Sequence, residues 1–257
     1  MLTHTWLLKK FIGAGHISRD NLDIFAYNVS PDFLPIHQSI TPEMTHGIPR
    51  LSGLPRKYRK AAFVLFHLLV DDMAHHGRIG GENAVPGFNP NSNGYAYAKG
   101  RPLIRPIMDF HKELGEEISF GEAAYRSHLI IEMSFDLVLY RKDSTLTALL
   151  SEALNYTIEN KLSEFSKTLA WIFDIRQEIV AEAINKGVTV YTKARFDNLM
   201  NVEGRICLYA DKFRHDSDDD RICGGIKNLF SQGMDLVADH EVFLHTTLEA
   251  IKKSGFK

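Results

Sequence analysis

The stretch KYRKAAFVLFHLLVDDMAHHG, residues 57–77, decides the fold class because it predicts a helix. Its apolar residues recur at helical spacing, and Gly77 is a suitable C-terminal cap. The only β-like run, VTVY at 188–191, is too short to build a sheet. Further helices are expected at 3–12, 19–26, 103–117, 119–141, 144–159, 161–186, 191–213 and 224–253. We therefore predict an all-α protein.

The chain of 257 residues is long enough for a large hydrophobic core without covalent staples. We expect a single large helical domain, similar to a helical bundle. Residues 1–142 would form its core, and residues 143–257 a C-terminal helical extension packed on the same domain.

The composition is that of an ordinary globular protein, with 44% hydrophobic and 24% charged residues. The net charge of −2 shows no basic excess, so we expect no nucleic-acid partner. Two cysteines cannot form a disulfide framework or a four-cysteine zinc site. No apolar run reaches the roughly 18 residues that span a bilayer. The N-terminus, MLTHTWLLKKFIGAGH, places its lysines after the apolar residues, unlike a secretory signal, so we expect a cytoplasmic protein.

Loops are predicted where proline and glycine punctuate the chain, at SPDFLP (30–35) and HGIPRLSGLP (46–55). The polar segment 78–101 predicts a longer loop. Loops of that length in compact domains are often functional, so we expect it to line or cover a site.

The twelve histidines are unevenly spread, with nine in the first 128 residues, which indicates a site built by the first half. His67, Asp71 and His75 are spaced four apart and share one face of the predicted helix. A carboxylate on so apolar a helix needs a partner. Two histidines can satisfy it by hydrogen bonds, and so can a divalent metal; His76 is an alternative ligand to His75.

A second ridge of the same kind lies in YRSHLIIEMSFDLVLY (125–140), where His128, Glu132 and Asp136 are spaced four apart. Two such ridges favour a metal site shared between helices. Further ligand types lie at His4, Asp32 and His46. Imidazoles and carboxylates without thiolates suit zinc, with manganese, nickel or iron as alternatives. Seven or eight such ligands indicate a catalytic cluster of two or more ions.

This ordered set resembles the zinc-dependent phospholipase C superfamily, which includes bacterial phospholipase C, related single-strand nucleases and glycosylphosphatidylinositol-specific phospholipase D. The resemblance covers roughly residues 1–140. It rests on Thr3-His4, Ser30-Pro31-Asp32, His46, His67-x-x-x-Asp71, His75 and His128-x-x-x-Glu132. The family fold is all-α, in agreement with the helical periodicity.

The resemblance implies two or three zinc ions. One would be held by Asp32, His46, His67 and Asp71, the second by His75, His128 and Glu132, with Asp71 bridging and His4 serving a third ion or completing the cluster. Secreted members use their N-terminal tryptophan as a zinc ligand, whereas Met1 stands first here. Whether the N-terminal amine takes part therefore stays open.

The implied activity is hydrolysis of a phosphodiester, in a phosphate-ester small molecule or a lipid head group. Two ions about 3.5–4 Å apart lower the pKa of a shared water and hold the phosphate oxygens. Asp32 can instead act as a general base. Arg101 or Arg105 is the expected partner of a non-bridging phosphate oxygen.

Two other interpretations remain. The ridges can form a structural metal site or a polar cluster in a non-catalytic helical protein, which would act through a partner or through homo-oligomerisation by its C-terminal helices. An oxygen-activating metal enzyme is less favoured by the ordered motif. We expect Asp136 to orient a ligand histidine or to form an ion pair, and His111, in DFHKELGEE, to lie on a solvated helix face.

Overall fold

The structure, a computed structural model, describes residues 1–51, 53–80 and 91–256 and contains no strand among them. The all-α prediction is therefore confirmed. The helices are α1 (Leu2–Ile12), α2 (Asp23–Phe33), α3 (Pro42–His46), α4 (Ala61–His76), α5 (Tyr95–Glu113), α6 (Phe120–Lys142), α7 (Thr145–Phe173), α8 (Gln177–Val190), α9 (Lys193–Leu199), α10 (Val202–Phe213), α11 (Asp220–Leu236) and α12 (His240–Lys253).

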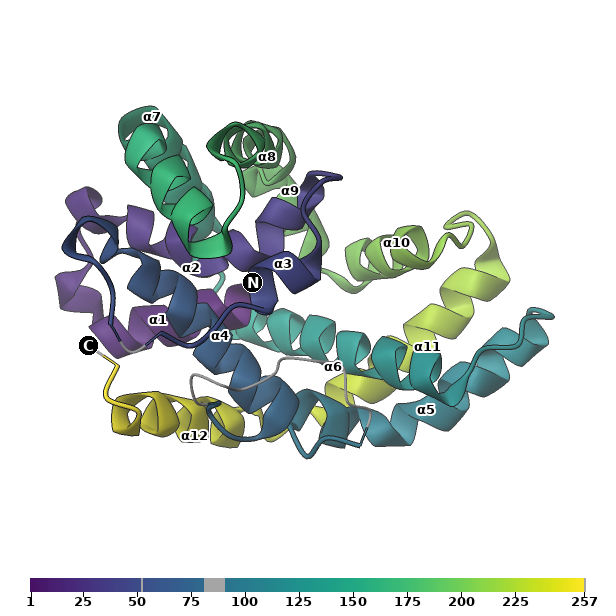
Figure 1. Cartoon of the computed structure of the whole chain (residues 1–257). Helices are drawn as coiled ribbons and strands as arrows, with labels where there is room; N and C mark the ends of the chain where they lie inside the picture. The colour runs from purple at the N-terminus through teal and green to yellow at the C-terminus, as the bar shows by residue number, and fades with distance from the viewer. Residues whose placement is uncertain (52, 81–90, 257) are drawn as a thin grey trace.

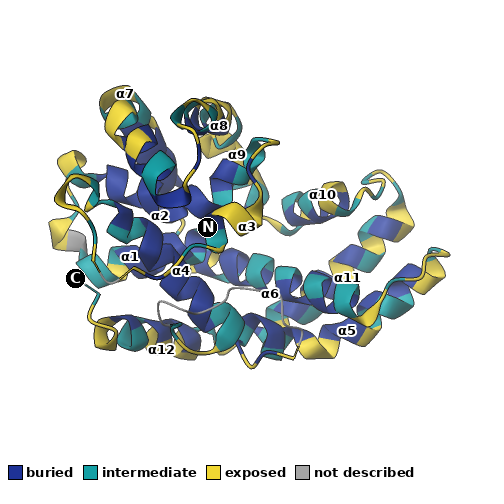
Figure 2. Cartoon of the chain, viewed as in Figure 1, coloured by how far each residue is buried: buried dark blue, intermediate teal, exposed yellow. Residues whose placement is uncertain are grey.

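Helix α4 lies near the centre of the molecule (Figure 1). It packs against α2 and α5, and α12 also contacts it. Its middle, from Val64 to Met73, is buried, and its two terminal turns are partly open to solvent (Figure 2). The helix ends as predicted at Gly77, which has a φ of 71° and donates its N–H to Met73 O.

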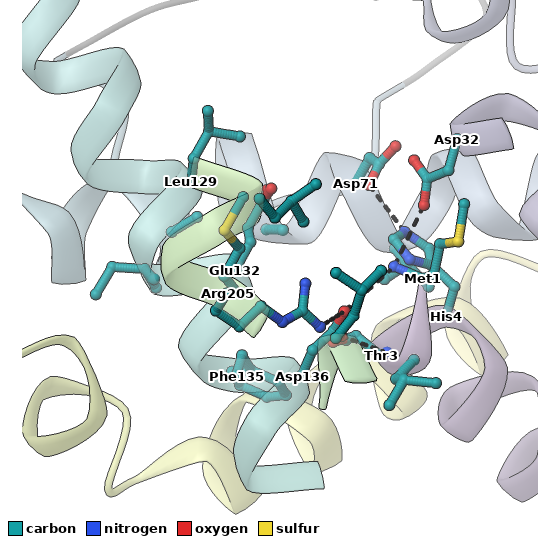
Figure 3. Close-up of a pocket in the computed structure, with 18 of the residues that line it drawn as sticks. Met1, Thr3, His4, Asp32, Asp71, Leu129, Glu132, Phe135, Asp136 and Arg205 are labelled. Carbon is teal, nitrogen blue, oxygen red and sulfur yellow. Dashed lines mark hydrogen bonds and ion pairs between the residues drawn. The ribbon is translucent and has the colours of Figure 1, made fainter. Parts of the chain in front are cut away.

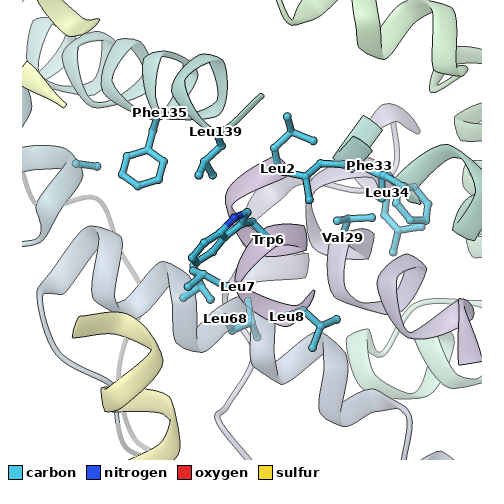
Figure 4. Close-up of a cluster of buried hydrophobic side chains, with 14 of the residues drawn as sticks. Leu2, Trp6, Leu7, Leu8, Val29, Phe33, Leu34, Leu68, Phe135 and Leu139 are labelled. Carbon is cyan, nitrogen blue, oxygen red and sulfur yellow. The ribbon is translucent and has the colours of Figure 1, made fainter. Parts of the chain in front are cut away.

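The core around α1 and α2 fixes the N-terminal helices against α4 and α6 (Figure 4). Leu2, Leu7 and Leu8 of α1 are fully buried, and Leu68 of α4 and Leu139 of α6 lie in the same cluster. Burying each such side chain contributes about 1.5–3 kcal/mol. This packing brings the first residues of the chain to α4, which the sequence places some sixty positions later.

The second half of the chain packs on the first half at several places. Helix α7 lies against α2, α11 against α5 and α6, and α12 against α4 and α1. The distal parts of α5, α6, α10 and α11 extend together to one side of the molecule (Figure 1). The proposed division near residue 142 stays a prediction.

Several expected loops and breaks are wrong. SPDFLP is not a loop, because α2 continues to Phe33 with Pro31 inside it. Ser30 Oγ donates to Tyr27 O at 2.8 Å and so occupies the carbonyl that a proline N–H cannot reach. Helix α5 begins at Tyr95, inside the expected loop 78–101, of which residues 81–90 lie outside the described part.

Helix boundaries in the second half also differ from the prediction. Helix α7 is continuous through Asn160, whose side chain donates to Tyr156 O, and it ends at Phe173, where Asp174 caps it with a φ of 52°. Helix α8 continues beyond residue 186, the expected end, and includes the VTV segment at 188–190. The helix expected at 224–253 is divided into α11 and α12 by residues 237–239. In the described part of the chain, no helix is long and apolar enough to cross a membrane.

Candidate metal centre

Five of the predicted ligands, contributed by four helices, meet in one group, which we call the Asp71 cluster: His4, Asp32, His46, His67 and Asp71. Asp71 is its centre. Its Oδ1 lies 2.9 Å from His4 Nε2, and its Oδ2 lies 3.2 Å from His67 Nε2 and 3.7 Å from His46 Nε2. Asp32 Oδ1 lies 3.4 Å from His46 Nε2 and 3.5 Å from His67 Nε2. The two carboxylates therefore share the same imidazoles.

Local structure and packing both place these side chains. His67 and Asp71 are one turn apart on α4. The ring of His4 stacks on that of His67, with centroids 3.7 Å apart and planes inclined by 10°. Thr45 Oγ1 donates to Pro31 O at 3.0 Å, which ties α3 to the end of α2. His46 is thereby held beside Asp32.

A second group, the Glu132 cluster, consists of His75, His128 and Glu132. His75 lies on the last turn of α4, and the other two are one turn apart on α6. His75 Nε2 lies 2.7 Å from Glu132 Oε1, and the rings of His75 and His128 are 5.7 Å apart. Tyr97 of α5 stacks on His128 at 4.8 Å. Helix α4 thus carries residues of both clusters.

Within each cluster, the carboxylates and the imidazoles stabilise one another's charges. Burial alone would raise the pKa of Asp71, but the His67 and His4 imidazoles hold it well below its usual range. Burial alone would lower the pKa of His67, yet Asp71 and Asp32 raise it to about 9. Glu132 likewise outweighs burial and raises the pKa of His75 to about 9. The carboxylates are therefore ionised at neutral pH, and a divalent ion would displace the protons of His67 and His75 on binding.

The Asp71 cluster contains buried polar atoms that fit a metal ion. His67 Nε2 and Asp71 Oδ2 are buried and find no aligned hydrogen-bond partner among the described residues. His4 Nδ1 is in the same position. Unsatisfied buried polar atoms are costly, and a divalent cation would satisfy an imidazole nitrogen and a carboxylate oxygen together. The donor set of imidazoles and carboxylates fits zinc.

Both clusters border one cavity of about 390 Å³ (Figure 3). His4, Asp32, His46 and Asp71 of the Asp71 cluster line it, and so do His75 and Glu132 of the Glu132 cluster. Apolar side chains form much of the remaining wall, including Leu129, Met133, Phe135, Phe196, Leu199 and Met200. The cavity therefore joins a polar face to an apolar one. His67 and His128 lie behind this lining, among the buried residues.

The two arginines expected to bind phosphate do not line the cavity, so the structure gives no support for that role. Arg101 donates to the carbonyl oxygens of Asn91 and Ser92, and Arg105 is exposed and pairs with Asp109. His76 is also absent from both clusters, and His75 is the member that contacts Glu132.

Sequence reasoning missed Arg205 of α10, which lines the cavity. Its Nη2 lies 3.4 Å from Asp136 Oδ2, so the ion-pair alternative for Asp136 is confirmed. The main-chain and side-chain groups of Thr3 both donate to the other oxygen of Asp136 at 3.1 Å. A signal was present, because Arg205 lies four and eight residues before Tyr209 and Phe213, on the buried stripe of its helix.

A third polar cluster, His111 with Glu116, Arg126 and His215, was also missed, and the expectation that His111 is solvated is wrong. The His111 side chain is fully buried. Its Nδ1 lies 2.7 Å from Glu116 Oε2, and Arg126 Nη1 donates to its Nε2 at 2.7 Å. Arg126 Nη1 also lies 3.3 Å from His215 Nε2. A guanidinium between the two imidazoles occupies the place that a metal ion would need.

Replacing His111 with glutamine is expected to weaken the loss of stability on acidification. Burial lowers the pKa of His111 below 6.5, and the bond to Glu116 only partly offsets this. The unfolded chain therefore binds the proton first, so this contribution is present above about pH 6.5 and is lost as the pH falls through the lower folded-state value. Denaturant unfolding at about pH 7.5 and about pH 5 measures the effect. An unchanged difference between wild type and variant at the two pH values would contradict it.

Replacing Gly94 with alanine is expected to destabilise the protein by about 1–3 kcal/mol and to displace His75. A Cβ at Gly94 would collide with the carbonyl group of His75, to which the Ser92 hydroxyl also donates. Thermal unfolding and zinc affinity are the measurements. Gly224→Ala, where a Cβ meets nothing within 4 Å, is the control and should be neutral or stabilise the helix by up to about 1 kcal/mol.

No family model, curated protein or solved structure matches this chain.

Proposed function

We propose that this protein is a metal-dependent phosphodiesterase, similar to the zinc-dependent phospholipase C superfamily. One observation carries the proposal. Two histidine-carboxylate clusters share helix α4 and border the same cavity. A structural metal site needs only one set of ligands and is closed to solvent, whereas a catalytic site keeps an open side.

The Asp71 cluster would hold one ion through Asp32, His46, His67 and Asp71, and the Glu132 cluster a second. His4 would complete the first set. Bound divalent ions would supply a water of low pKa and stabilise the charge on the phosphate oxygens.

The protein's own residues would orient the substrate and accept a proton from the attacking water. Asp32 borders the cavity, and its side chain is 25% exposed. The neighbouring His67 imidazole holds the pKa of Asp32 well below the usual range of a carboxyl group, despite burial. Instead of binding the ion, an ionised carboxylate at this place can accept a proton from an attacking water. The apolar wall of the cavity would exclude bulk water and receive the uncharged part of a phosphate ester, such as the glycerol and upper acyl part of a lipid.

A second interpretation has its own support. His4 and Asp71, and His75 and Glu132, already form short contacts without any ion. The clusters can therefore be polar networks that hold α1, α4 and α6 together in a non-catalytic protein. In that case oligomerisation through the C-terminal helices would be the working part. The cytoplasmic location also remains a proposal.

Metal content and hydrolysis of bis(4-nitrophenyl) phosphate test the proposal together. Untagged protein should contain two or more zinc ions per chain, lose its activity with a chelator and regain it with zinc. The double variant His67→Ala/His128→Ala should lose both metal and activity. The matched control His16→Ala/His245→Ala removes two exposed histidines and should keep both. If the protein holds no stoichiometric metal after dialysis against zinc and manganese, the phosphodiesterase proposal is contradicted and the polar-network interpretation is favoured.

A further inference from the structure

We infer that Arg205 binds a non-bridging oxygen of the phosphoryl group in the cavity. The inference rests on the proposed function and names the residue that holds the substrate's phosphate. It replaces the two arginines that the sequence suggested, which lie outside the cavity. Arg205 comes from α10, in the second half of the chain, so that half would complete the site.

Arg205 is nearly fully buried, yet most of its hydrogen-bonding capacity is unused. A guanidinium has five N–H donors. In the described part of the chain, Arg205 donates hydrogen bonds through Nη2, to Asp136 Oδ2 and to Met200 Sδ, each at 3.4 Å. The Nε atom is buried without a partner in the described part of the chain. Figure 3 shows the other end of the guanidinium pointing into the cavity, toward the space between Glu132 and Asp71.

Asp136 fixes the position of the Arg205 guanidinium. Asp136 accepts two hydrogen bonds from Thr3 on one oxygen and pairs with Arg205 through the other. Asp136 is one turn from Glu132 on α6, so the two carboxylates share a helix face. Arg205 is therefore held beside the Glu132 cluster, and Asp136 is its positioning residue.

An oxyanion is the ligand that best fits these donors. Arginine binds phosphate oxygens with charge-assisted hydrogen bonds, and such bonds are stronger in a cavity than in water. Four carboxylates border the cavity, at Asp32, Asp71, Glu132 and Asp136, and they would repel a phosphate anion. The Met1 ammonium group, which also lines the cavity, pairs with Asp32 and Asp136. Arg205 is a second buried cation of the lining, and its free donors offset the repulsion at one place. Arg195, the other arginine in the lining, is exposed.

Binding of inorganic phosphate to the zinc-loaded protein, measured by calorimetry, tests the inference without any turnover. Arg205→Met should weaken phosphate binding by about 10- to 100-fold, as expected for the loss of a charge-assisted hydrogen bond. Arg205→Lys keeps the positive charge but loses the planar guanidinium, so its phosphate affinity should lie between those of the wild type and Arg205→Met. Arg105→Met, at an exposed arginine outside the cavity, is the matched control and should bind like wild type.

Zinc stoichiometry and thermal unfolding of each variant show whether the site is intact. If Arg205→Met does not fold, Arg205→Lys decides, because it keeps the ion pair with Asp136. Wild-type affinity in the folded Arg205 variants, or no phosphate binding by the zinc-loaded wild type, would overturn the inference. Arginine-dependent phosphate binding without diester hydrolysis would overturn the proposed function alone. Hydrolysis with an unchanged KM in both variants would overturn the inference alone.

Discussion

Replacing Asp71 with asparagine is expected to reduce zinc affinity and diester hydrolysis by at least about 100-fold. Loss of a residue that only orients a ligand already lowers affinity by about 10–100-fold, and Asp71 contacts three imidazoles directly. The amide keeps the size of the side chain but removes the charge that a bridging ligand needs. Zinc titration and the steady-state rate with bis(4-nitrophenyl) phosphate are the measurements.

The same substitution should also destabilise the metal-free protein, by about 3 kcal/mol, because it leaves buried imidazoles without their counter-charge. Asp23→Asn is the matched control. Asp23 is fully buried, pairs with Lys60 and is not part of the cavity lining, so this variant should lose stability without losing zinc. Wild-type zinc affinity in Asp71→Asn would show that Asp71 belongs to a polar network instead of a metal site.

Replacing Phe165 with alanine is expected to lower stability by about 3–5 kcal/mol, and the unfolding midpoint by roughly 6–20 °C. Phe165 of α7 is fully buried. Its ring lies edge-on to Tyr27 at 4.7 Å and near Phe33 at 6.3 Å, both on α2. The variant leaves a cavity at the contact between the two halves of the chain. Phe165→Leu, which refills most of the space, should lose much less.

The contact between Phe165 and Phe33 also affects the position of Asp32 in the Asp71 cluster. Asp32 directly precedes Phe33 on the last turn of α2, so a shift of this turn moves a candidate ligand. Zinc affinity should therefore fall in Phe165→Ala even at temperatures where the variant is folded. Calorimetric unfolding and zinc titration measure the two effects. Separate unfolding of residues 1–142 and 143–257, with zinc binding unchanged, would show that the halves are independent.

Local periodicity was enough to predict part of the site. The pairs His67 with Asp71 and His128 with Glu132 are one turn apart, so a correct helix prediction placed them on common faces. The glycine cap of α4 followed from the same rules. The proline rules failed at Pro31, because a serine hydroxyl satisfies the freed carbonyl and the helix continues through Asp32.

Long-range packing was not readable in this way. His4 lies 67 positions from Asp71 along the chain, and their contact depends on the burial of α1 against α4 and α6. The third polar cluster unites His111 with His215, more than a hundred residues apart. The contact of Arg205 with Asp136 spans 69 positions. No periodicity links such residues, since only the folded core sets the distance between their helices.

The sequence by itself thus determined that the chain is helical and that His67 with Asp71, and His128 with Glu132, share helix faces, because a helix repeats every 3.6 residues wherever it forms. The tertiary structure decided that both ridges border one cavity, that Arg101 and Arg105 lie outside it and that Arg205 lies inside. The physical reason is that the hydrophobic effect favours burial without selecting particular partners along the sequence. The close packing of whole helix faces decides which helices are neighbours, and this sets which polar side chains meet.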